Sequence, residues 1–149
     1  MSIHSKILYI IIFLTCQYSL IAKDYYVHPQ LGNDTNTGFS KNEAFKTLKR
    51  VETINFKPGD RILLAAGQTF KKGISLINIH GSKVNPIIIT SFPWETSHSL
   101  LKAIIDFQGE ANGVLLEDCS FIEISNISLT GNGYIDNNPN QKMRCGILI

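Results

Sequence analysis

Short apolar runs dominate the chain from Arg61 onward, and each run closes at Gly, Asn, Pro or Asp. β-Branched residues are frequent in these runs, and none keeps helical spacing long enough to form a good helix. The pattern therefore predicts a series of short β-strands separated by tight turns. The predicted strands span residues 62–66, 73–77, 86–90, 103–107, 113–116, 121–124, 127–130 and 146–149.

Two arrangements could use such strands: a sandwich of hairpins or a coil of stacked parallel turns. The hairpin signal is poor, because the Asn-Gly pairs at 112–113 and 132–133 flank loops instead of joining alternating strands. Gly73, Gly113 and Gly146 each open an apolar run, as expected if one position of a coil recurs at irregular intervals. The coil is the favoured prediction.

The segment 121–131 supports a coil through its interrupted alternation. Ile122 and Ile124 point one way, Asn126 breaks the pattern, and Ile127 and Leu129 resume it. Two short strands meeting at a bend would produce this pattern. Asparagine suits the bend because it tolerates a left-handed backbone at little cost.

The segment before the coil predicts a strand, a loop and one helix. A short β-rich run over 24–27 stops at Pro29, and residues 32–38 are almost all turn formers. Their Asp-x-Asn-x-Gly spacing lacks the remaining ligands of a calcium loop, so an Asx-rich turn is favoured. Ser40 to Glu43 reads as a capping box, and apolar spacing predicts an amphipathic helix from about Lys41 to about Thr53. Its outer face of Lys46, Lys49, Arg50 and Glu52 is interpreted as solvated.

That helix lies directly before the first predicted turn of the coil. The end of a coil exposes unpaired strand edges and needs a cover. We therefore expect the helix to cap the first turn.

The first residues read as an export signal. A short basic start precedes the apolar run 7–14, which is too short to span a bilayer. We predict a signal peptide over 1–22, cleaved after Ala22, with Leu20 fitting the small-residue rule poorly. A lipoprotein anchored at Cys16 is the alternative. The chain is therefore divided into a signal peptide (1–22), a cap (23–60) and a coil (61–149). The signal predicts a secreted, periplasmic or cell-surface protein.

Charge and cysteine content narrow the function classes. The chain has 149 residues and a formal charge of +2, with its basic residues scattered, so nucleic acid is not an expected partner. Cys119 and Cys145 could form a disulfide in an exported protein. Because they fall at different points of their predicted turns, two separate wall residues are favoured. No Cys/His cluster with zinc spacing occurs in the sequence.

A set of short motifs before and at the start of the coil resembles a known superfamily. These motifs are 25–29 (Tyr-Tyr-Val-His-Pro), 32–38 (Gly-Asn-Asp to Gly), 45–48 (Phe-Lys-Thr-Leu), 58–62 (Pro-Gly-Asp-Arg-Ile) and 67–70 (Gly-Gln-Thr-Phe). In this order they resemble the amino-terminal region of pectate-lyase-like proteins. The resemblance implies an all-β, right-handed parallel β-helix, and exported polysaccharide lyase or glycoside hydrolase activity, including action on uronic-acid polymers. It places the catalytic groups, and calcium where used, on later turns, so no catalytic or metal-binding residue is assigned here.

Several residues nevertheless carry chemistry that such enzymes use. Lyase chemistry needs a base and cations, and hydrolysis needs paired carboxylates. Each of these residues lies beside a predicted turn, so an ordinary solvated charge is the favoured interpretation. The cations are Lys71, Lys72, Lys102 and Arg144, and the carboxylates are Asp106, Glu110, Glu117 and Asp118.

The remaining candidates are aromatic or histidine side chains. Trp94 could stack on a sugar ring, but a loop-anchoring core aromatic is favoured. His28 is expected to cap a strand, and His80 and His98 lie in loops without metal-ligand spacing.

Three functions remain open from the sequence. The first is the amino-terminal part of an exported polysaccharide lyase or glycoside hydrolase, without a cofactor in this segment. The second is a non-catalytic surface protein that binds carbohydrate. The third is a truncated chain with no activity of its own, because few turns bury little surface.

Overall fold

The computed structural model describes residues 21–96, 100–132 and 145–149 of the chain. The predicted signal peptide up to residue 20, with Cys16, lies outside the described residues, as do His98 and Arg144. Across the described ranges, no helix is long and apolar enough to cross a membrane.

The described chain is mostly β-structure arranged in three parallel sheets. The first sheet has the order β1-β2-β5-β8, the second β3-β6-β9 and the third β10-β7-β4. The strands are β1 (Asp24–Val27), β2 (Arg61–Ala65), β3 (Thr69–Lys71), β4 (Ile74–Ile77), β5 (Ile87–Phe92), β6 (Ala103–Asp106), β7 (Asn112–Glu117), β8 (Ile122–Ser125), β9 (Ile127–Thr130) and β10 (Cys145–Leu148).

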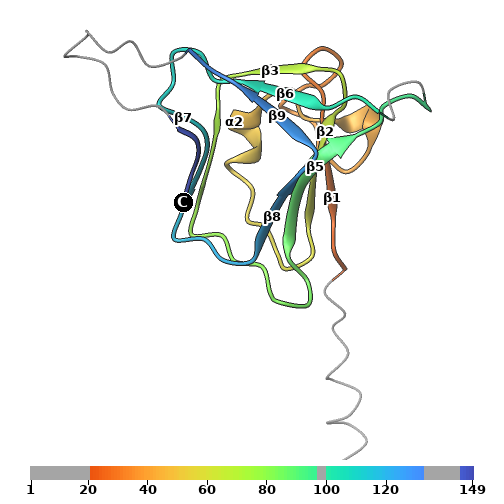
Figure 1. Ribbon diagram of the computed structural model, residues 1–149. Coiled ribbons are helices and arrows are strands. Elements are labelled where there is room, and N and C mark those ends of the chain that lie inside the picture. Colours follow the sequence, from red (N-terminus) through yellow and green to blue (C-terminus); the bar gives the residue numbers. More distant parts are fainter. Residues whose placement is uncertain (1–20, 97–99, 133–144) are drawn as a thin grey trace, which may run out of the picture.

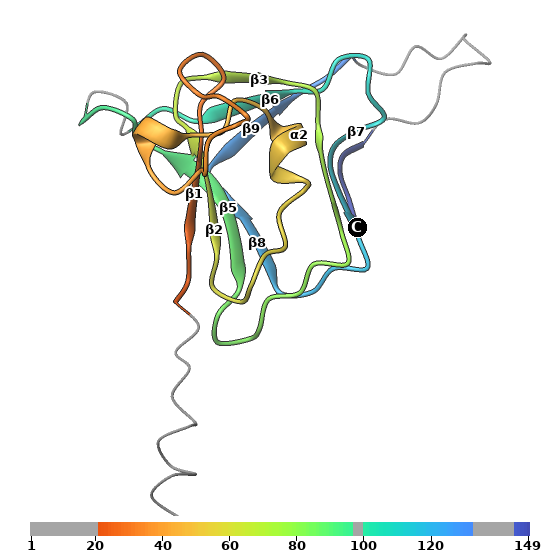
Figure 2. The same ribbon diagram turned by 180° about the vertical axis from the view of Figure 1, so that it is seen from behind.

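The chain visits the three sheets in a fixed order. It passes from β2 to β3 to β4, then from β5 to β6 to β7, and then from β8 to β9. Figure 1 shows the three sheets as the sides of a triangle, and Figure 2 shows the same outline from behind. All named pairings are parallel, for example Ile74 with Val114 and Ile89 with Ile124. The all-β prediction is confirmed, and the hairpin sandwich is excluded for the described strands.

Glycines recur at one corner of the triangle, as the apolar runs predicted. A Cβ added to Gly73 would lie 2.2 Å from the carbonyl oxygen of Asn112, and one added to Gly113 would lie 2.7 Å from that of Gly146. Successive turns therefore approach each other so closely here that a side chain would collide with the next backbone.

The core lies inside the triangle. Strands such as β4 and β5 contribute alternate residues to it, whereas residues 62–65 of β2 are all buried. In β5, Ile87 and Ile89 are fully buried whereas Ile88 and Thr90 are only partly buried. The bend between β8 and β9 occurs at Asn126, whose φ of 53° is left-handed, as predicted. The largest fully buried side chains are Phe45, Phe70, Ile62, Leu64, Ile74, Leu76, Ile87, Ile89, Ile105, Val27, Val51 and Val114.

The single helix predicted over 41–53 is wrong. A 3-10 turn, η1 (Lys41–Glu43), and one α-helical turn, α2 (Leu48–Val51), stand in its place. Between them Phe45 is extended and pairs with Val27 at the edge of the first sheet: its N–H donates to Tyr26 at 2.9 Å. An unbroken helix would forfeit this pairing. Half of the predicted capping box is present: Ser40 accepts from the Glu43 N–H at 3.3 Å, but the Glu43 carboxylate accepts from the Thr37 hydroxyl instead of from Ser40. Thr47 caps α2 by accepting from the Arg50 N–H.

The short helix α2 packs against β4, the edge strand of the third sheet. It buries Leu48 and Val51, and it projects into the middle of the triangle in both views (Figures 1 and 2). Glu52, just after the helix, accepts a hydrogen bond from the N–H of Ser75 in β4 at 2.9 Å. The Glu52 carboxylate thereby provides an acceptor for the Ser75 N–H, which lies on the open edge of β4 and has no neighbouring strand to pair with. Glu52 was interpreted as a solvated residue, and that interpretation is wrong.

Candidate functional site

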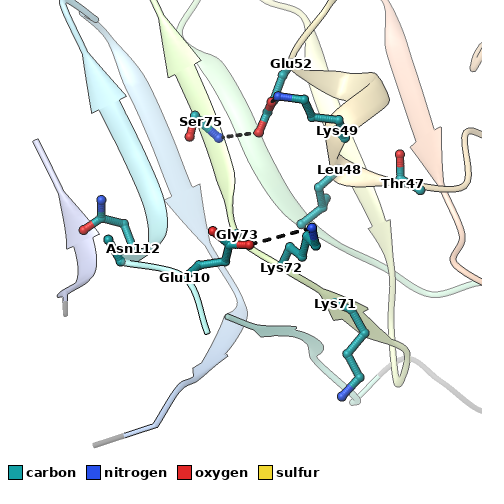
Figure 3. Close-up of a pocket in the computed structure, with 11 residues that line it drawn as sticks. Thr47, Leu48, Lys49, Glu52, Lys71, Lys72, Gly73, Ser75, Glu110 and Asn112 are labelled. Atoms are coloured by element: carbon teal, nitrogen blue, oxygen red, sulfur yellow. Dashed lines mark hydrogen bonds and ion pairs between the residues drawn. The ribbon is translucent and has the colours of Figure 1, made fainter. Parts of the chain in front are cut away.

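A pocket of about 680 Å³ lies where α2 faces the start of β4 and the segment entering β7. Its walls come from three parts of the chain that are far apart in sequence, and Figure 3 shows their side chains around the opening. The lining residues are Thr47, Leu48, Lys49, Glu52, Lys71, Lys72, Gly73, Ser75, Glu110, Ala111 and Asn112.

The backbone on one side of the pocket is held in an unusual conformation. Lys72 has a φ of 73°, in the left-handed region that non-glycine residues rarely adopt. Its N–H donates to the carbonyl of Asp106 at 2.9 Å, and Gly73 follows at the crowded corner. This wall is therefore fixed by the stacking of successive turns, which preorganises the pocket.

Four of the five charged side chains that line the pocket are paired with one another. Lys72 lies 3.9 Å from Glu110, and Lys49 lies 2.7 Å from Glu52, which also accepts from Ser75 (Figure 3). Both lysines are largely exposed, so these pairs contribute little to stability and their donors remain within reach of a ligand. Together with the Asn112 amide, they form a polar surface suited to hydroxyl-rich or carboxylate-bearing ligands.

Lys71 and Asp106 form the tightest ion pair near this site. The Lys71 ammonium lies 2.5 Å from the Asp106 carboxylate, whose side chain is 9% exposed. This hydrogen bond lowers the pKa of Asp106, with further support from the Gln108 N–H and against the effect of burial. Asp106 is therefore ionised at neutral pH and is unsuited to act as a general acid. In Figure 3, Lys71 extends away from the other labelled side chains of the pocket.

The other predicted site residues are dispersed. Glu117 ends β7 and is exposed, and Asp118 follows in a left-handed conformation with a φ of 49°. Lys102 is exposed just before β6, where its carbonyl accepts from Gly67. The structure thus gathers Lys71, Lys72 and Glu110 at the pocket and leaves these three elsewhere.

His80 is held by two neighbouring side chains. Its ring nitrogens lie 3.0 Å from the Ser120 hydroxyl and 2.9 Å from the Asn78 side-chain oxygen. These contacts join two consecutive corners, which also share a parallel bridge between His80 and Ser120. The arrangement is structural.

Trp94 belongs to an aromatic cluster on the outside of the first sheet. Its ring contacts those of Tyr26 and His28 edge-on, with centroids 6.2 and 4.7 Å apart. Lys41 donates to the Trp94 carbonyl at 2.7 Å and lies over the indole ring. Trp94 also packs against the core, so its interpretation as a loop-anchoring aromatic is confirmed.

His28 is buried and organises the turn that follows β1. Its Nδ1 atom accepts from the backbone N–H groups of Gln30 and Leu31, each at 3.2 Å. Nδ1 is therefore unprotonated in this arrangement, and the predicted capping role of His28 is confirmed.

The turn-rich loop at 32–38 uses its own oxygens to hold the backbone. Asn33 accepts from the Thr35 N–H at 3.0 Å, which is an Asx turn. Asp34 accepts from the N–H groups of Lys46 and Thr47 at 2.8 and 2.9 Å, tying the loop to the start of α2. Over the described ranges, no group of three or more His, Cys, Asp or Glu side chains is placed to hold a metal.

Cys119 and Cys145 occupy different positions of their turns and are free thiols. Cys145 pairs with Asn112 at the start of β7, whereas Cys119 follows the end of that strand and donates to the Leu76 carbonyl at 3.3 Å. Both side chains are partly buried.

Five polar residues of the pocket were not among the candidates predicted from the sequence: Thr47, Lys49, Glu52, Ser75 and Asn112. The positions of Ser75 and Asn112 follow from the strand register, in which both lie next to the glycine corner. Glu52 carries no sequence signal, because its role depends on how α2 packs over the sheet edge.

Comparison with known proteins gives two kinds of match. No family model matches the chain. A curated lacto-N-biosidase from Bifidobacterium longum subsp. longum is 27% identical over 71% of this chain, which spans only 8% of that relative. Crystal structures of a GH136 lacto-N-biosidase from Eubacterium ramulus, native and selenomethionine forms, match with a TM-score of 0.72. They are 24% identical and cover 84% of this chain, which spans 23% of theirs.

These matches correct the predicted superfamily. The solved structures that resemble the chain are glycoside hydrolases of family GH136, so the assignment to pectate-lyase-like proteins is wrong. The motifs behind that assignment form β1, the Asx turn and the β2 turn, which build the fold. They do not encode a reaction, and a fold is shared by proteins of different activity.

Proposed function

We propose that the chain is the amino-terminal part of an exported, glycoside-hydrolase-like protein that acts on glycans. The supporting observation is that the sequence match and the structural match both lead to lacto-N-biosidases, over 71% and 84% of this chain. The relatives named are hydrolases, so the lyase and uronic-acid alternatives receive no support from them.

The same proposal includes the finer architecture. The three parallel sheets are taken as the first turns of a right-handed parallel β-helix, with 23–60 as the cap and 61–149 as the coil. Residues 1–22 are taken as the signal peptide. Calcium on later turns of a longer protein remains a prediction.

Within this protein, the pocket beside α2 is proposed to bind sugar. Its ammonium groups, carboxylates and amide provide donors and acceptors for hydroxyl groups, and its wall is preorganised by the glycine corner. Asp106, the most strongly held of the predicted carboxylates, is ionised and paired with Lys71. For that reason we assign binding, and not bond cleavage, to the described part of the chain.

A second candidate function is non-catalytic carbohydrate binding by the whole protein. The Lys49–Glu52 and Lys72–Glu110 pairs favour this second function. Carboxylates already paired with lysines are suited to binding a sugar and less suited to cleaving it. The two candidates differ in whether the glycosidic bond is broken.

The test is to titrate the isotope-labelled chain with lacto-N-biose and to follow backbone NMR shifts. We expect shifts at Lys72, Gly73, Ser75 and Asn112, which weaken in Lys72→Ala and persist in Lys46→Ala, a control on the exposed surface. A chromogenic lacto-N-bioside incubated with the same protein distinguishes hydrolysis from binding. Absence of shifts at the pocket with lacto-N-biose and with other glycans would overturn the sugar-binding assignment.

A further inference from the structure

Asp60 is a buried carboxylate held by backbone amides. It is 1% exposed, and its two oxygens accept from the N–H of Lys23 at 2.8 Å and the N–H of Lys57 at 2.9 Å. The ion pairs of the described residues do not include it. Its negative charge is felt nearby, since the pKa of Tyr25 is raised by burial and, secondarily, by Asp60. A buried carboxylate without a cation is an expensive arrangement.

Lys23 is positioned by contacts that do not involve the residues before it. Its carbonyl accepts from the Arg61 N–H at 2.8 Å, and the next residue, Asp24, pairs with Arg61 in the β1–β2 register. The Arg61 guanidinium also grips the Asp24 carboxylate through two bonds of 2.6 Å. The nitrogen of Lys23 is therefore held beside Asp60 whether or not residue 22 is attached.

The bond before Lys23 is exposed. Ile21 is 81% exposed and Ala22 is also exposed, where it lies over the turn at Gly59. This is the bond at which the sequence predicts signal cleavage, with the small residue Ala22 on its amino-terminal side. Hydrolysis here adds water and yields a carboxylate on Ala22 and an α-amino group on Lys23. That amine takes up a proton near neutral pH and becomes an ammonium.

We propose that the chain is processed between Ala22 and Lys23, and that the new α-ammonium group of Lys23 forms a partly buried ion pair with Asp60. This inference rests on the proposed export of the protein. Cleavage converts the backbone nitrogen of Lys23 from a neutral amide donor into a charged ammonium donor, while the chain stays in place. A hydrogen bond between two charged groups is shorter and stronger than one from a neutral amide. Removal of the leader is thus coupled to completion of the fold at its first strand.

The processing site is tested on the full chain expressed with its own leader in a bacterial host. We expect the amino terminus of the exported protein to be Lys23 by mass spectrometry. A start at Cys16, or at any other residue, would overturn the assignment of the cleavage site. Glycan binding at the pocket is measured separately, so this failure would overturn the 1–22 signal peptide and leave the proposed sugar binding standing.

The ion pair is tested by comparing chains that begin at Lys23 and at Ile21 and end at Ile149. We expect the Lys23 form to melt roughly 3–8 °C higher, a gain abolished by acetylating its α-amino group. Asp60→Asn should lower the melting temperature of the Lys23 form more than that of the Ile21 form. Equal melting temperatures for the two native-sequence forms would overturn the ion pair. As a second readout, the Lys23 α-amine should react several-fold more slowly with an acylating reagent in the native protein than in Asp60→Asn.

Discussion

The Glu52 carboxylate accepts a hydrogen bond from the backbone N–H of Ser75 at 2.9 Å, which joins the end of α2 to the edge of the third sheet. The bond lies at β4, the edge strand of the third sheet, on the side where β4 has no neighbouring strand. It also places Glu52 in the wall of the pocket. The attachment of α2 to the sheet edge and the candidate site therefore depend on the same side chain.

Replacing Glu52 by Ala should destabilise the protein by about 1–3 kcal/mol, because it leaves the Ser75 N–H without its partner. Glu52→Gln keeps an acceptor oxygen and should cost clearly less. Urea denaturation measures both. Lys49→Ala is the matched control, since it removes only an exposed partner of Glu52 and should change stability by less than about 1 kcal/mol. Equal losses for the Ala and Gln variants would contradict the role of this bond.

Gly73→Ala should be costly, by about 1–3 kcal/mol, because its Cβ would lie 2.2 Å from the Asn112 carbonyl oxygen. Gly146→Ala is the control from the same glycine corner. The nearest atom to its Cβ is a leucine methyl at 3.4 Å, an ordinary contact. We expect its thermal unfolding to match that of the native chain within about 0.5 kcal/mol. If both substitutions change the free energy of unfolding equally, successive turns do not approach each other at Gly73 as closely as described.

Stability should fall in acid through the Lys71–Asp106 pair. The pKa of Asp106 is lowered in the folded state, chiefly by its hydrogen bond with Lys71. Its contribution is therefore fully present above the unfolded-state value of about 3.9 and is lost as the pH falls through the folded-state value. Asp106→Asn should flatten the dependence of the melting temperature on pH below about 4. A variant that keeps the native slope would show that other carboxylates cause it.

Asn126→Ala tests the bend between β8 and β9. The side chain is exposed and the φ is 53°, so the substitution changes the backbone preference and little else. We expect a loss of about 1 kcal/mol for Ala, whereas Asn126→Gly should remain close to the native stability. Chemical denaturation of the two variants side by side is the measurement. Identical values for Ala and Gly would show that the left-handed geometry carries no strain.

Strands such as β4 and β5 were predictable because their buried faces repeat with a period of two, whereas β2 was predictable as a short apolar run that is buried on both faces. The runs at 62–66 and 86–90 became β2 and β5, and the alternation interrupted at Asn126 became β8 and β9. The strand β3 was not predicted as such, because only Phe70 is buried between two exposed residues. A three-residue strand with one buried side chain carries too little pattern to be recognised.

The helix and the pocket were less predictable, for a common reason. Helical spacing over 41–53 is real, yet the pairing of Phe45 with Val27 overrides it, and that pairing depends on a distant strand. In the same way, Lys72 and Glu110 meet only because successive turns stack. Local sequence cannot specify contacts that exist only after the chain has closed a full circuit.

The three sheets are joined by connecting segments at the corners of the triangle, and these segments differ from the strands in how much their length can vary. The inner strands of each sheet are aligned by neighbours on both sides, as Ile89 is by Ile62 and Ile124. The connection between β4 and β5 shares in that alignment, because His80 forms a parallel bridge with Ser120. Connections without such a bridge can differ in length without shifting the strands. Replacing the loops at such corners could therefore introduce new surface side chains while the stacked strands keep their alignment.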